Sequence, residues 1–282
     1  MIQAKVIAHS IANDIPIVTL QLKYPRMIHE EFMTHRVFSR NASSSRAIPV
    51  AKMLDRVREE HATPIHWGRN QPGMQAEAEL EGMEKEAAQG LWHTAAMSAA
   101  SYAEGMTELN VHKQIANRLT EPFQHINVIV TATEWDNFFK LRDHKAAQPE
   151  IRELAQRIRE AISNSNPNEL KYGEWHLPYL ISSDKELNIN DARLVSAARC
   201  ARVSYVNHDN SDPDTYKDIA LARRLIASGH FSPTEHQATP MEYVSGALYD
   251  RKEWENGITH MDKYANLWSG NFKGWIQYRQ LL

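Results

Sequence analysis

The sequence predicts an α+β fold, because segments with strand character and long helical segments both occur along one chain. Residues 15–22 alternate between two faces, one of them apolar, which is typical of a strand. Residues 126–132 form a β-branched run that predicts a second strand. The sequence between them is helical in composition, rich in Glu and Ala over 76–89 and in Ala, Met and Trp over 91–109. Two predicted strands therefore flank a helical block.

A further helix is predicted from Pro149, a residue that suits the first helical turn. Its apolar residues recur at three- and four-residue spacing and line one face: Ile151, Leu154, Ala155, Ile158 and Ile162. The polar run 164–168 ends this helix, and residues 175–184, which contain Pro178, predict a loop.

Two more helices are predicted towards the C-terminus. Asp191 is expected to cap a helix that runs through Ala201. The next helix begins at about Asp214 and ends before Gly229. The tail, residues 254–278, is dense in aromatic residues and Gly.

The composition is that of an ordinary globular chain. Of 282 residues, 42% are hydrophobic and 24% charged, which argues against a disordered or fibrous protein. The net charge of −3 argues against a nucleic-acid polymer or an anionic membrane as partner, because both require a basic excess. No stretch has the length of a membrane span or the plan of a signal peptide, so a cytoplasmic location is expected.

Cys200 is the only cysteine and cannot form an intrachain disulfide. It lies among small residues, where a buried structural cysteine is expected. A mechanism that depends on a cysteine nucleophile therefore has little support.

Residues 34–46 combine three Arg, one His and several hydroxyl groups with no acidic residue. Such a set of donors is what a phosphate or pyrophosphate site needs. The alternative is a solvated loop, in which the same residue types are common. Composition alone leaves both interpretations open.

Arg118 and Arg142 are two further candidates for ligand contacts. Arg118 is expected near a helix end just before the strand at 126, either stabilised by the helix dipole or projecting into a cleft. Asn137 and Arg142 would differ by about 140° on one helix and would not share a narrow stripe, but a ligand that wraps the helix end could touch both. The neighbouring Trp135, Phe138, Phe139 and Leu141 are expected in the core.

Residues 229–236 predict a Gly-His turn that opens a helix, with Ser232 as cap and Pro233 at the first position. Its backbone N–H groups would suit an anion. His230, Glu235 and His236 also raise the alternative of a metal site. Because the Glu-His pair is adjacent and a third ligand at a recognisable spacing is missing, no metal is expected.

Together, these segments resemble the flavin-dependent thymidylate synthases. The hallmark of that family is Arg-His-Arg, seven residues and then Ser, usually continuing through Asn-Glu-x-Ser-x-Arg-Tyr. The residues that fall on this pattern are His35, Arg36, Ser39, Asn41, Ser44 and Arg46. Three positions depart from it, with Thr34 in place of the first Arg, Ala42 in place of the Glu and Ala47 in place of the Tyr.

Three other segments match the same family. Its nucleotide-holding Arg shortly before a Pro corresponds to Arg118 and Pro122. Its Asn-x-x-x-Leu-Arg helix and the following Ala-Gln-x-Glu-Ile correspond to Asn137, Leu141, Arg142, Ala147, Gln148, Glu150 and Ile151. Its flavin-contacting Gly-His turn corresponds to Gly229, His230, Ser232, Pro233, Glu235 and His236.

The order of the segments differs from the family, in which the Ala-Arg-Val-Ser-Tyr segment (here 201–205) and the Gly-His turn precede the Arg-His-Arg segment. We hypothesise a circular permutation, in which residues 201–236 occupy the family's N-terminal position. The hypothesis requires residues 229–236 to lie near His35 and Asn137, in one subunit or between subunits.

The C-terminal tail could supply what the changed motif lacks. The family reaches the nucleotide phosphate with a Gln and an Arg just before its His-Arg pair, where this chain has Glu31 and Thr34. Gln277 and Arg279 have the missing chemistry and are predicted to bind substrate. The alternative is an aromatic lid or packing segment.

The resemblance implies an α/β fold with a central, mainly antiparallel sheet flanked by long helices. It also implies a homotetramer that binds FAD across subunits. A single domain over 1–282 is expected, with the nucleotide and flavin core in 1–163 and the permuted turn and the tail in 190–282. The implied flavin contacts are His35, Arg36, Val37, Asn137, Leu141, Arg142, His230, Ser232 and Glu235.

The implied reaction passes a one-carbon unit from methylenetetrahydrofolate to C5 of dUMP, with hydride from reduced FAD and with NADPH as the reductant. Ser44, Arg46 and Arg118 would hold the nucleotide, and Arg142 would stabilise charge on the pyrimidine, so Arg142 and Arg118 are the catalytic candidates. Two alternatives are a dUMP or dCMP hydroxymethylase on the same fold and a non-catalytic protein that binds flavin or nucleotide.

Overall fold

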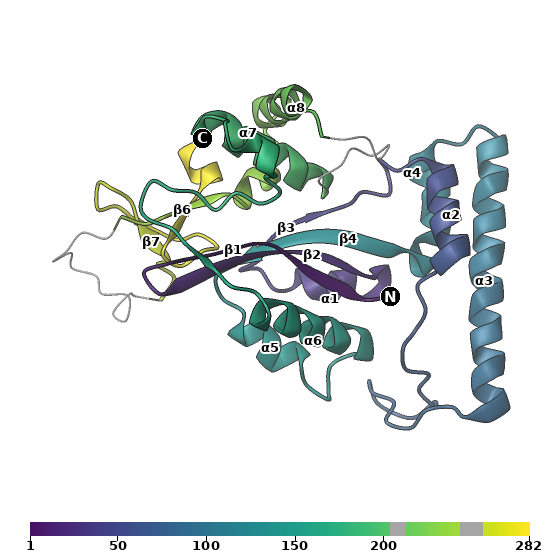
Figure 1. Ribbon diagram of the computed structural model, residues 1–282. Helices are drawn as coiled ribbons and strands as arrows, with labels where there is room; N and C mark the ends of the chain where they lie inside the picture. Colours follow the sequence, from purple (N-terminus) through teal and green to yellow (C-terminus); the bar gives the residue numbers. More distant parts are fainter. Residues whose placement is uncertain (204–212, 243–255) are drawn as a thin grey trace.

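The computed structural model describes residues 1–203, 213–242 and 256–282. A five-stranded sheet in the order β3-β4-β2-β1-β5 runs through its centre (Figure 1). The strands are β1 Gln3–Ala12, β2 Ile15–Pro25, β3 Ser39–Ala42, β4 His125–Ala132 and β5 Asn168–Glu169. Neighbours pair antiparallel except β1 and β5, which pair parallel. The prediction of an α/β fold with a central, mainly antiparallel sheet is confirmed.

The two predicted strands are confirmed as β2 and β4, whereas β1 and β3 were not predicted. A tight turn joins β1 to β2 through Asn13 and Asp14, whose φ angles are 49° and 59°. Short hairpin turns favour Asn and Asp because both central residues need positive φ. The turn therefore fixes β1 beside β2 with Ala12 opposite Ile15.

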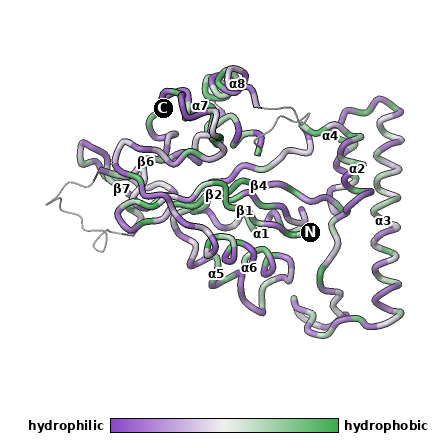
Figure 2. Tube along the Cα trace, in the orientation of Figure 1, coloured by the Kyte–Doolittle hydropathy of each residue, from purple (hydrophilic) through white to green (hydrophobic). Residues whose placement is uncertain are grey.

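One face of the sheet is apolar and forms the main core. Leu20 and Leu22 of β2 and Val130 of β4 are fully buried on this face. The helices that cover it are α1 His29–Met33, α5 Asp136–Arg142 and α6 Pro149–Ser163 (Figure 1). Their contributions to the core include Phe32, Phe138 and Leu154. Figure 2 shows hydrophobic segments along the central strands.

The C-terminal part of the chain covers the opposite face of the sheet (Figure 1). Its main elements are α7 Ile189–Arg202, α8 Thr215–Ala227, β6 Ala238–Pro240 and β9 Trp275–Gln277. Trp275 is fully buried against Ile15 and Ile17 of β2, and its ring nitrogen donates to the Ile15 carbonyl at 3.2 Å. This face also carries buried polar residues, among them Thr19 and Thr131.

The predicted helical block between the strands is a helical hairpin that stands beyond one end of the sheet (Figure 1). It consists of α3 Gly82–Glu108, which corresponds to the predicted block, and α2 Val50–Glu60, which was not predicted. Ala96, Ala100 and Ala103 of α3 are fully buried, which lets the two helices approach closely. The prediction of helix over 76–81 is wrong, because Leu80 donates its N–H to the Trp67 carbonyl at 2.8 Å in an extended pairing.

The ends of the three later predicted helices, α6, α7 and α8, agree with the structure except at one cap. Pro149 begins α6 and Asp214 caps α8, while Gly229 follows α8 with a φ of 77°. The prediction that Asp191 caps α7 is wrong, since the Asn188 side chain accepts from two backbone N–H groups there. Asp191 lies in the first turn, where an acidic residue also favours the helix.

The remaining elements are short connectors. They are the 3-10 helices η1 Arg26–Ile28, η2 Asn117–Phe123, η3 Ser182–Asp184, η4 Ser232–Glu235 and η5 Tyr278–Leu281, with α4 Lys113–Ala116, β7 His260–Met261 and β8 Leu267–Trp268. In the part of the chain that the structure describes, no helix combines the length and hydropathy needed to cross a bilayer.

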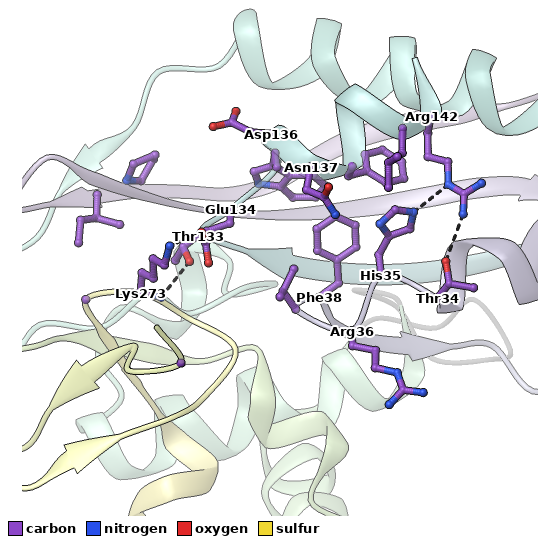
Figure 3. Close-up of a pocket in the computed structure, with 18 of the residues that line it drawn as sticks. Thr34, His35, Arg36, Phe38, Thr133, Glu134, Asp136, Asn137, Arg142 and Lys273 are labelled. Carbon is purple, nitrogen blue, oxygen red and sulfur yellow. Dashed lines mark hydrogen bonds and ion pairs between the residues drawn. The ribbon is translucent and has the colours of Figure 1, made fainter. Parts of the chain in front are cut away.

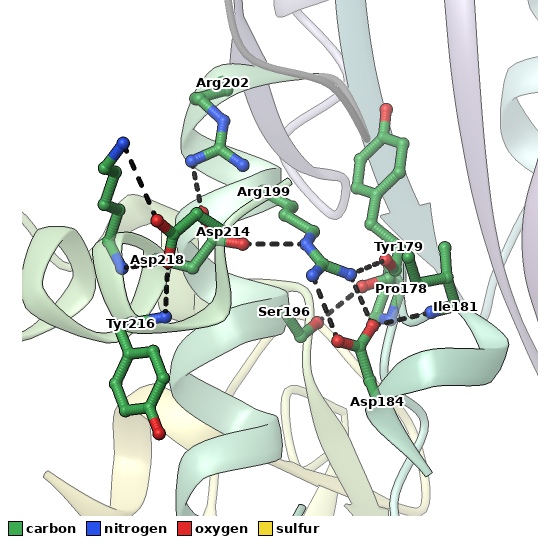
Figure 4. A network of polar contacts seen from close by, with 11 residues as sticks. Pro178, Tyr179, Ile181, Asp184, Ser196, Arg199, Arg202, Asp214, Tyr216 and Asp218 are labelled. Carbon is green, nitrogen blue, oxygen red and sulfur yellow. Dashed lines mark hydrogen bonds and ion pairs between the residues drawn. The ribbon is translucent and has the colours of Figure 1, made fainter. Parts of the chain in front are cut away.

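A buried ion network fastens α7 to its neighbours (Figure 4). The Arg199 guanidinium is fully buried and donates to Asp184 at 2.5 and 3.1 Å and to Asp218 of α8 at 2.9 Å. It also donates to the Tyr179 carbonyl at 2.8 Å. Since buried charges must be paired, this network fixes α7, α8 and the loop before η3 together.

Removal of Asp184 should destabilise the fold strongly, because it leaves the buried Arg199 cation with one carboxylate partner. We expect Asp184→Ala to lower the free energy of unfolding by about 3–5 kcal/mol in urea denaturation. Asp214→Ala is the matched control, since this more exposed cap should cost only about 1 kcal/mol. Equal losses in the two variants would contradict the role of the network.

Candidate functional site

A cavity of about 960 Å³ lies where the first and last parts of the chain meet (Figure 3). One wall is the loop between α1 and β3, and another comes from the end of β4 and from α5. The C-terminal part closes the cavity. The segments that line it are residues 15–16, 34–38, 133–138, 141–142, 256–258 and 273–274.

Six of the predicted flavin contacts line this one cavity: His35, Arg36, Val37, Asn137, Leu141 and Arg142. They come from two segments that are more than ninety residues apart in the chain. The register of β3 with β4 explains the meeting, because Ser39 at the start of β3 pairs with Thr131 near the end of β4. The loop before β3 therefore lies beside α5, which follows β4.

His35 is held as a neutral side chain. It is 7% exposed and packs edge-on against Phe138, with ring centroids 4.9 Å apart. Burial, with added repulsion from Arg142 and Arg40, lowers the pKa of His35 to about 4. Arg142 Nε donates to His35 Nε2 at 2.8 Å, so the imidazole proton lies on Nδ1. His35 therefore offers one N–H donor at neutral pH.

Arg142, at the end of α5, is held by three residues of α1 and its C-terminal end. Besides the bond to His35, Nη2 donates to the Thr34 hydroxyl at 3.2 Å. Nη1 forms an ion pair with Glu31. A guanidinium has five N–H groups and these contacts use three of them, which leaves donors for a ligand in the cavity.

The cavity combines an aromatic floor with charged walls. The ring centroids of Phe38 and Trp135 are 4.7 Å apart, and the ring of Phe138 packs against that of Phe38. Trp135 is 8% exposed, and its ring N–H has no hydrogen-bond partner among the residues described. On another wall, Lys273 Nζ forms an ion pair with Glu134 at 2.5 Å. The flat aromatic surface suits a large planar ligand.

Ser44, Arg46 and Arg118 form a second group, at the other end of β3. They do not line the cavity, because they follow β3 or precede β4. Arg118 is exposed and forms an ion pair with Glu121 at 3.7 Å. The Asn117 side chain donates to the carbonyl of Ser45 at 2.7 Å, which fixes the loop of Ser44 and Arg46 next to η2.

The Gly-His turn and the tail form a third group, beside β3 within the same chain. Gln277 is 5% exposed and its amide donates to the Ser39 hydroxyl at 2.9 Å and to the Glu235 carbonyl at 2.8 Å. Arg279 forms an ion pair with Glu235. The predicted contacts of Gln277 and Arg279 with a nucleotide stay predictions, while in the chain both residues connect the tail to the turn.

The turn itself differs from the prediction at its cap. Phe231, not Ser232, occupies the N-cap position of η4, and no side chain caps it. The prediction of Ser232 as cap is therefore wrong. His230 and Ser232 do not line the cavity. Of the segment 201–205, Ser204 and Tyr205 lie outside the described residues, as do Trp254 and Glu255 of the tail.

A chain of buried hydrogen bonds crosses the sheet from β1 to the turn, and sequence reasoning missed it. Its links are Ser10 to His176 at 2.9 Å, His176 to Thr19 at 2.8 Å, Thr19 to Thr131 at 2.7 Å and Thr131 to His236 at 2.9 Å. All five side chains are at most 6% exposed. The only signal in the sequence is one Thr in each of two apolar strands.

Burial decides two predictions about individual residues. The prediction that Leu141 lies in the core is wrong, because the residue is 51% exposed and lines the cavity. Cys200 is fully buried and its pKa is raised by burial, as expected for a structural cysteine. Within the described ranges, no group of His, Cys, Asp or Glu residues could hold a metal ion.

A family model described as thymidylate synthase complementing protein matches residues 7–168. The comparison with curated proteins gave no match. Two solved structures are similar to this chain at low sequence identity. A UMP/dUMP methylase PolB from Streptomyces cacaoi has 14% identity and a TM-score of 0.48 over 58% of this chain and 90% of its own. Thymidylate Synthase X from Helicobacter pylori has 17% identity and a TM-score of 0.38 over 52% and 67%.

The buried histidines should make the fold sensitive to acid. Burial lowers the pKa of His176 and of His236 from 6.5 to about 3. The unfolded chain then binds protons below about pH 6.5 that the folded chain binds only near pH 3. Stability should therefore fall as the pH falls through this window, by at most about 1.4 kcal/mol per pH unit for each histidine.

His176→Gln should weaken this dependence by about the contribution of one histidine. Urea denaturation between pH 7 and pH 5 measures it, with the exposed His230→Gln as the control whose slope should equal that of the wild type. A slope unchanged in His176→Gln would contradict the prediction.

Proposed function

Because the chain belongs to the thymidylate synthase complementing protein family, we propose that it catalyses flavin-dependent modification of deoxyuridylate at C5. The proposed reaction would transfer a one-carbon unit from methylenetetrahydrofolate to C5 of dUMP and give dTMP, with FAD as the cofactor and NADPH as the reductant. The observation that carries this proposal is the single cavity lined by His35, Asn137, Leu141 and Arg142.

The residues of the cavity fit a flavin. The Nδ1–H of His35 is a donor suited to a ring acceptor, and Asn137 adds an exposed amide from α5. Arg36 also lines the cavity and suits a phosphate group. Bound FAD would supply the hydride, while the protein contributes position, electrostatics and exclusion of water.

Arg142 is the proposed catalytic cation. Negative charge develops on the pyrimidine when C5 attacks the one-carbon donor, and a fixed N–H donor at the ring oxygens stabilises it. The three partners of Arg142 restrict its rotation, so little reorganisation is needed during the reaction.

We also propose that the complete site uses more than one copy of the chain, in a homotetramer. Support comes from Ser44, Arg46 and Arg118, the proposed nucleotide-phosphate residues, which lie at the end of β3 away from the cavity. A second copy could bring its own group of these residues to the cavity. Chromatography with light scattering tests the assembly.

One observation favours the hydroxymethylase alternative. Lys273 and Glu134 in the cavity wall are 50% and 40% exposed, so water can reach this side of the cavity. Water in place of hydride would give a hydroxymethyl product from the same methylene intermediate. The product analysis described next also tests whether either reaction uses dUMP or dCMP.

Product analysis distinguishes these functions. We expect the purified protein, incubated with dUMP, methylenetetrahydrofolate, FAD and NADPH, to yield a nucleotide heavier by CH₂ in mass spectrometry. A gain of CH₂O would indicate the hydroxymethylase, and a yellow protein without product would indicate a non-catalytic one. A colourless protein that does not take up FAD would contradict both catalytic functions.

Arg142→Lys should reduce kcat by about 10²–10³, because Lys keeps the charge but loses the fixed planar donors. Steady-state kinetics with dUMP measures the change. The control is Arg157→Lys on α6, whose side chain is 52% exposed and pairs with Glu153, and it should retain full activity. Equal activity of the two variants would exclude Arg142 from the chemistry.

A further inference from the structure

We infer that Glu31 is a positioning residue that neutralises Arg142, so that this end of the cavity selects an uncharged oxygen, such as a pyrimidine carbonyl, over a phosphate. The identification of that oxygen with a pyrimidine rests on the proposed function. The charge argument rests on the contacts of Arg142 alone.

The contacts of Arg142 place one full negative charge, the Glu31 carboxylate, against its guanidinium. The Glu31 carboxylate forms an ion pair with Nη1, and the Thr34 hydroxyl accepts from Nη2 at 3.2 Å. That hydroxyl donates its own proton to the Glu31 carbonyl at 2.7 Å, so its lone pairs face the guanidinium. His35 completes the set through Nε2 and is neutral. The group therefore has a net charge near zero.

Glu31 reaches Arg142 from outside the cavity. Glu31 does not line the 960 Å³ cavity that Arg142 lines. It lines a neighbouring hollow of about 1310 Å³, between the segments 64–77 and 145–156. The carboxylate thus neutralises Arg142 from behind without occupying the space in which a ligand would bind. This geometry makes Glu31 a positioning residue and not a ligand contact.

Partial burial makes the pairing effective. The side chains of Arg142 and Glu31 are 17% and 29% exposed, so solvent screens their attraction less than that of a surface pair. A phosphate approaching Arg142 would meet a cation that already has a carboxylate partner. A neutral carbonyl needs only the unused N–H donors, which the pairing leaves in place.

Two residues that depart from the family pattern in this region, Glu31 and Thr34, are among the three that contact Arg142. The pattern has Gln and Arg where this chain has Glu31 and Thr34. An Arg at position 34 would lie within contact distance of Arg142 and repel it, since the Thr34 hydroxyl is 3.2 Å away. Together the two changes lower the local charge by two units, which agrees with a subsite that no longer holds a phosphate.

Anion titration of a charge-removing variant tests the inference. Glu31→Gln keeps the size and one acceptor but removes the charge, so pyrophosphate should bind about five- to tenfold tighter than to the wild type. Deoxyuridine affinity should change little. A merely structural role would weaken binding of both probes, so the direction of the pyrophosphate change separates the two explanations.

Glu134→Gln is the matched control, because it removes the same charge from the wall of the same cavity beside Lys273. The double variant with Arg142→Gln and Glu31→Gln should lose the gain in pyrophosphate affinity, since that gain acts through Arg142. An equal gain in Glu134→Gln, a gain that survives the loss of Arg142, or no gain in Glu31→Gln would each overturn the inference.

If Glu31→Gln does not fold, as judged by circular dichroism, Glu31→Asp decides the question. Because Asp is one methylene shorter than Glu, its carboxylate lies farther from Arg142 and neutralises the guanidinium less. Pyrophosphate should therefore bind about twofold tighter than to the wild type. Unchanged pyrophosphate binding in Glu31→Asp would overturn the inference. Because these titrations need no flavin turnover, a failure of the proposed function is detected separately, as a wild-type protein without FAD binding or product.

Discussion

The position of β3 depends on hydrogen bonds that the Ser39 hydroxyl accepts from the C-terminal tail. β3 is an edge strand of four residues, and such a short strand holds its place weakly by pairing alone. Gln277 and Asn271 bind the hydroxyl at 2.9 and 3.1 Å and so fasten the strand to the tail. The loop that carries His35 leads directly into β3. The tail therefore acts on the cavity through the strand, even where its side chains are far from a ligand.

The sequence predicted those elements whose pattern is local. β2, β4 and α6 have clear periodicity, and α8 has a cap and a terminating Gly, so each was located within a few residues. The prediction missed β1, in which polar residues interrupt the alternation, because its pairing with β2 comes from the hairpin turn. It also extended helix into 76–81, where good helix formers are held by an extended pairing instead. Local propensity lost to tertiary contacts in both cases.

The candidate site could be predicted in part, through motif residues that are close in sequence. His35, Arg36, Val37, Asn137, Leu141 and Arg142 do line one cavity. The partners that control them were not predicted, because the Glu31–Arg142 pair spans 111 positions and the Lys273–Glu134 pair also joins distant segments. The sequence does not reveal whether the polar atoms of Gln277 and Trp135 face a ligand or the protein. Such assignments require the register of β3 with β4 and the path of the tail.

The buried chain from Ser10 to His236 constrains where protons can lie. A hydroxyl has one proton, so Thr19 and Thr131 can each donate to one neighbour and must accept from the other. All links then point the same way, and reversing one requires reversing all. In one arrangement the proton of His236 is on Nδ1, and in the other it is on Nε2, the atom without a partner among the described residues. The tautomer of a histidine in the Gly-His turn is thus coupled to a serine of β1, on the far side of two strands.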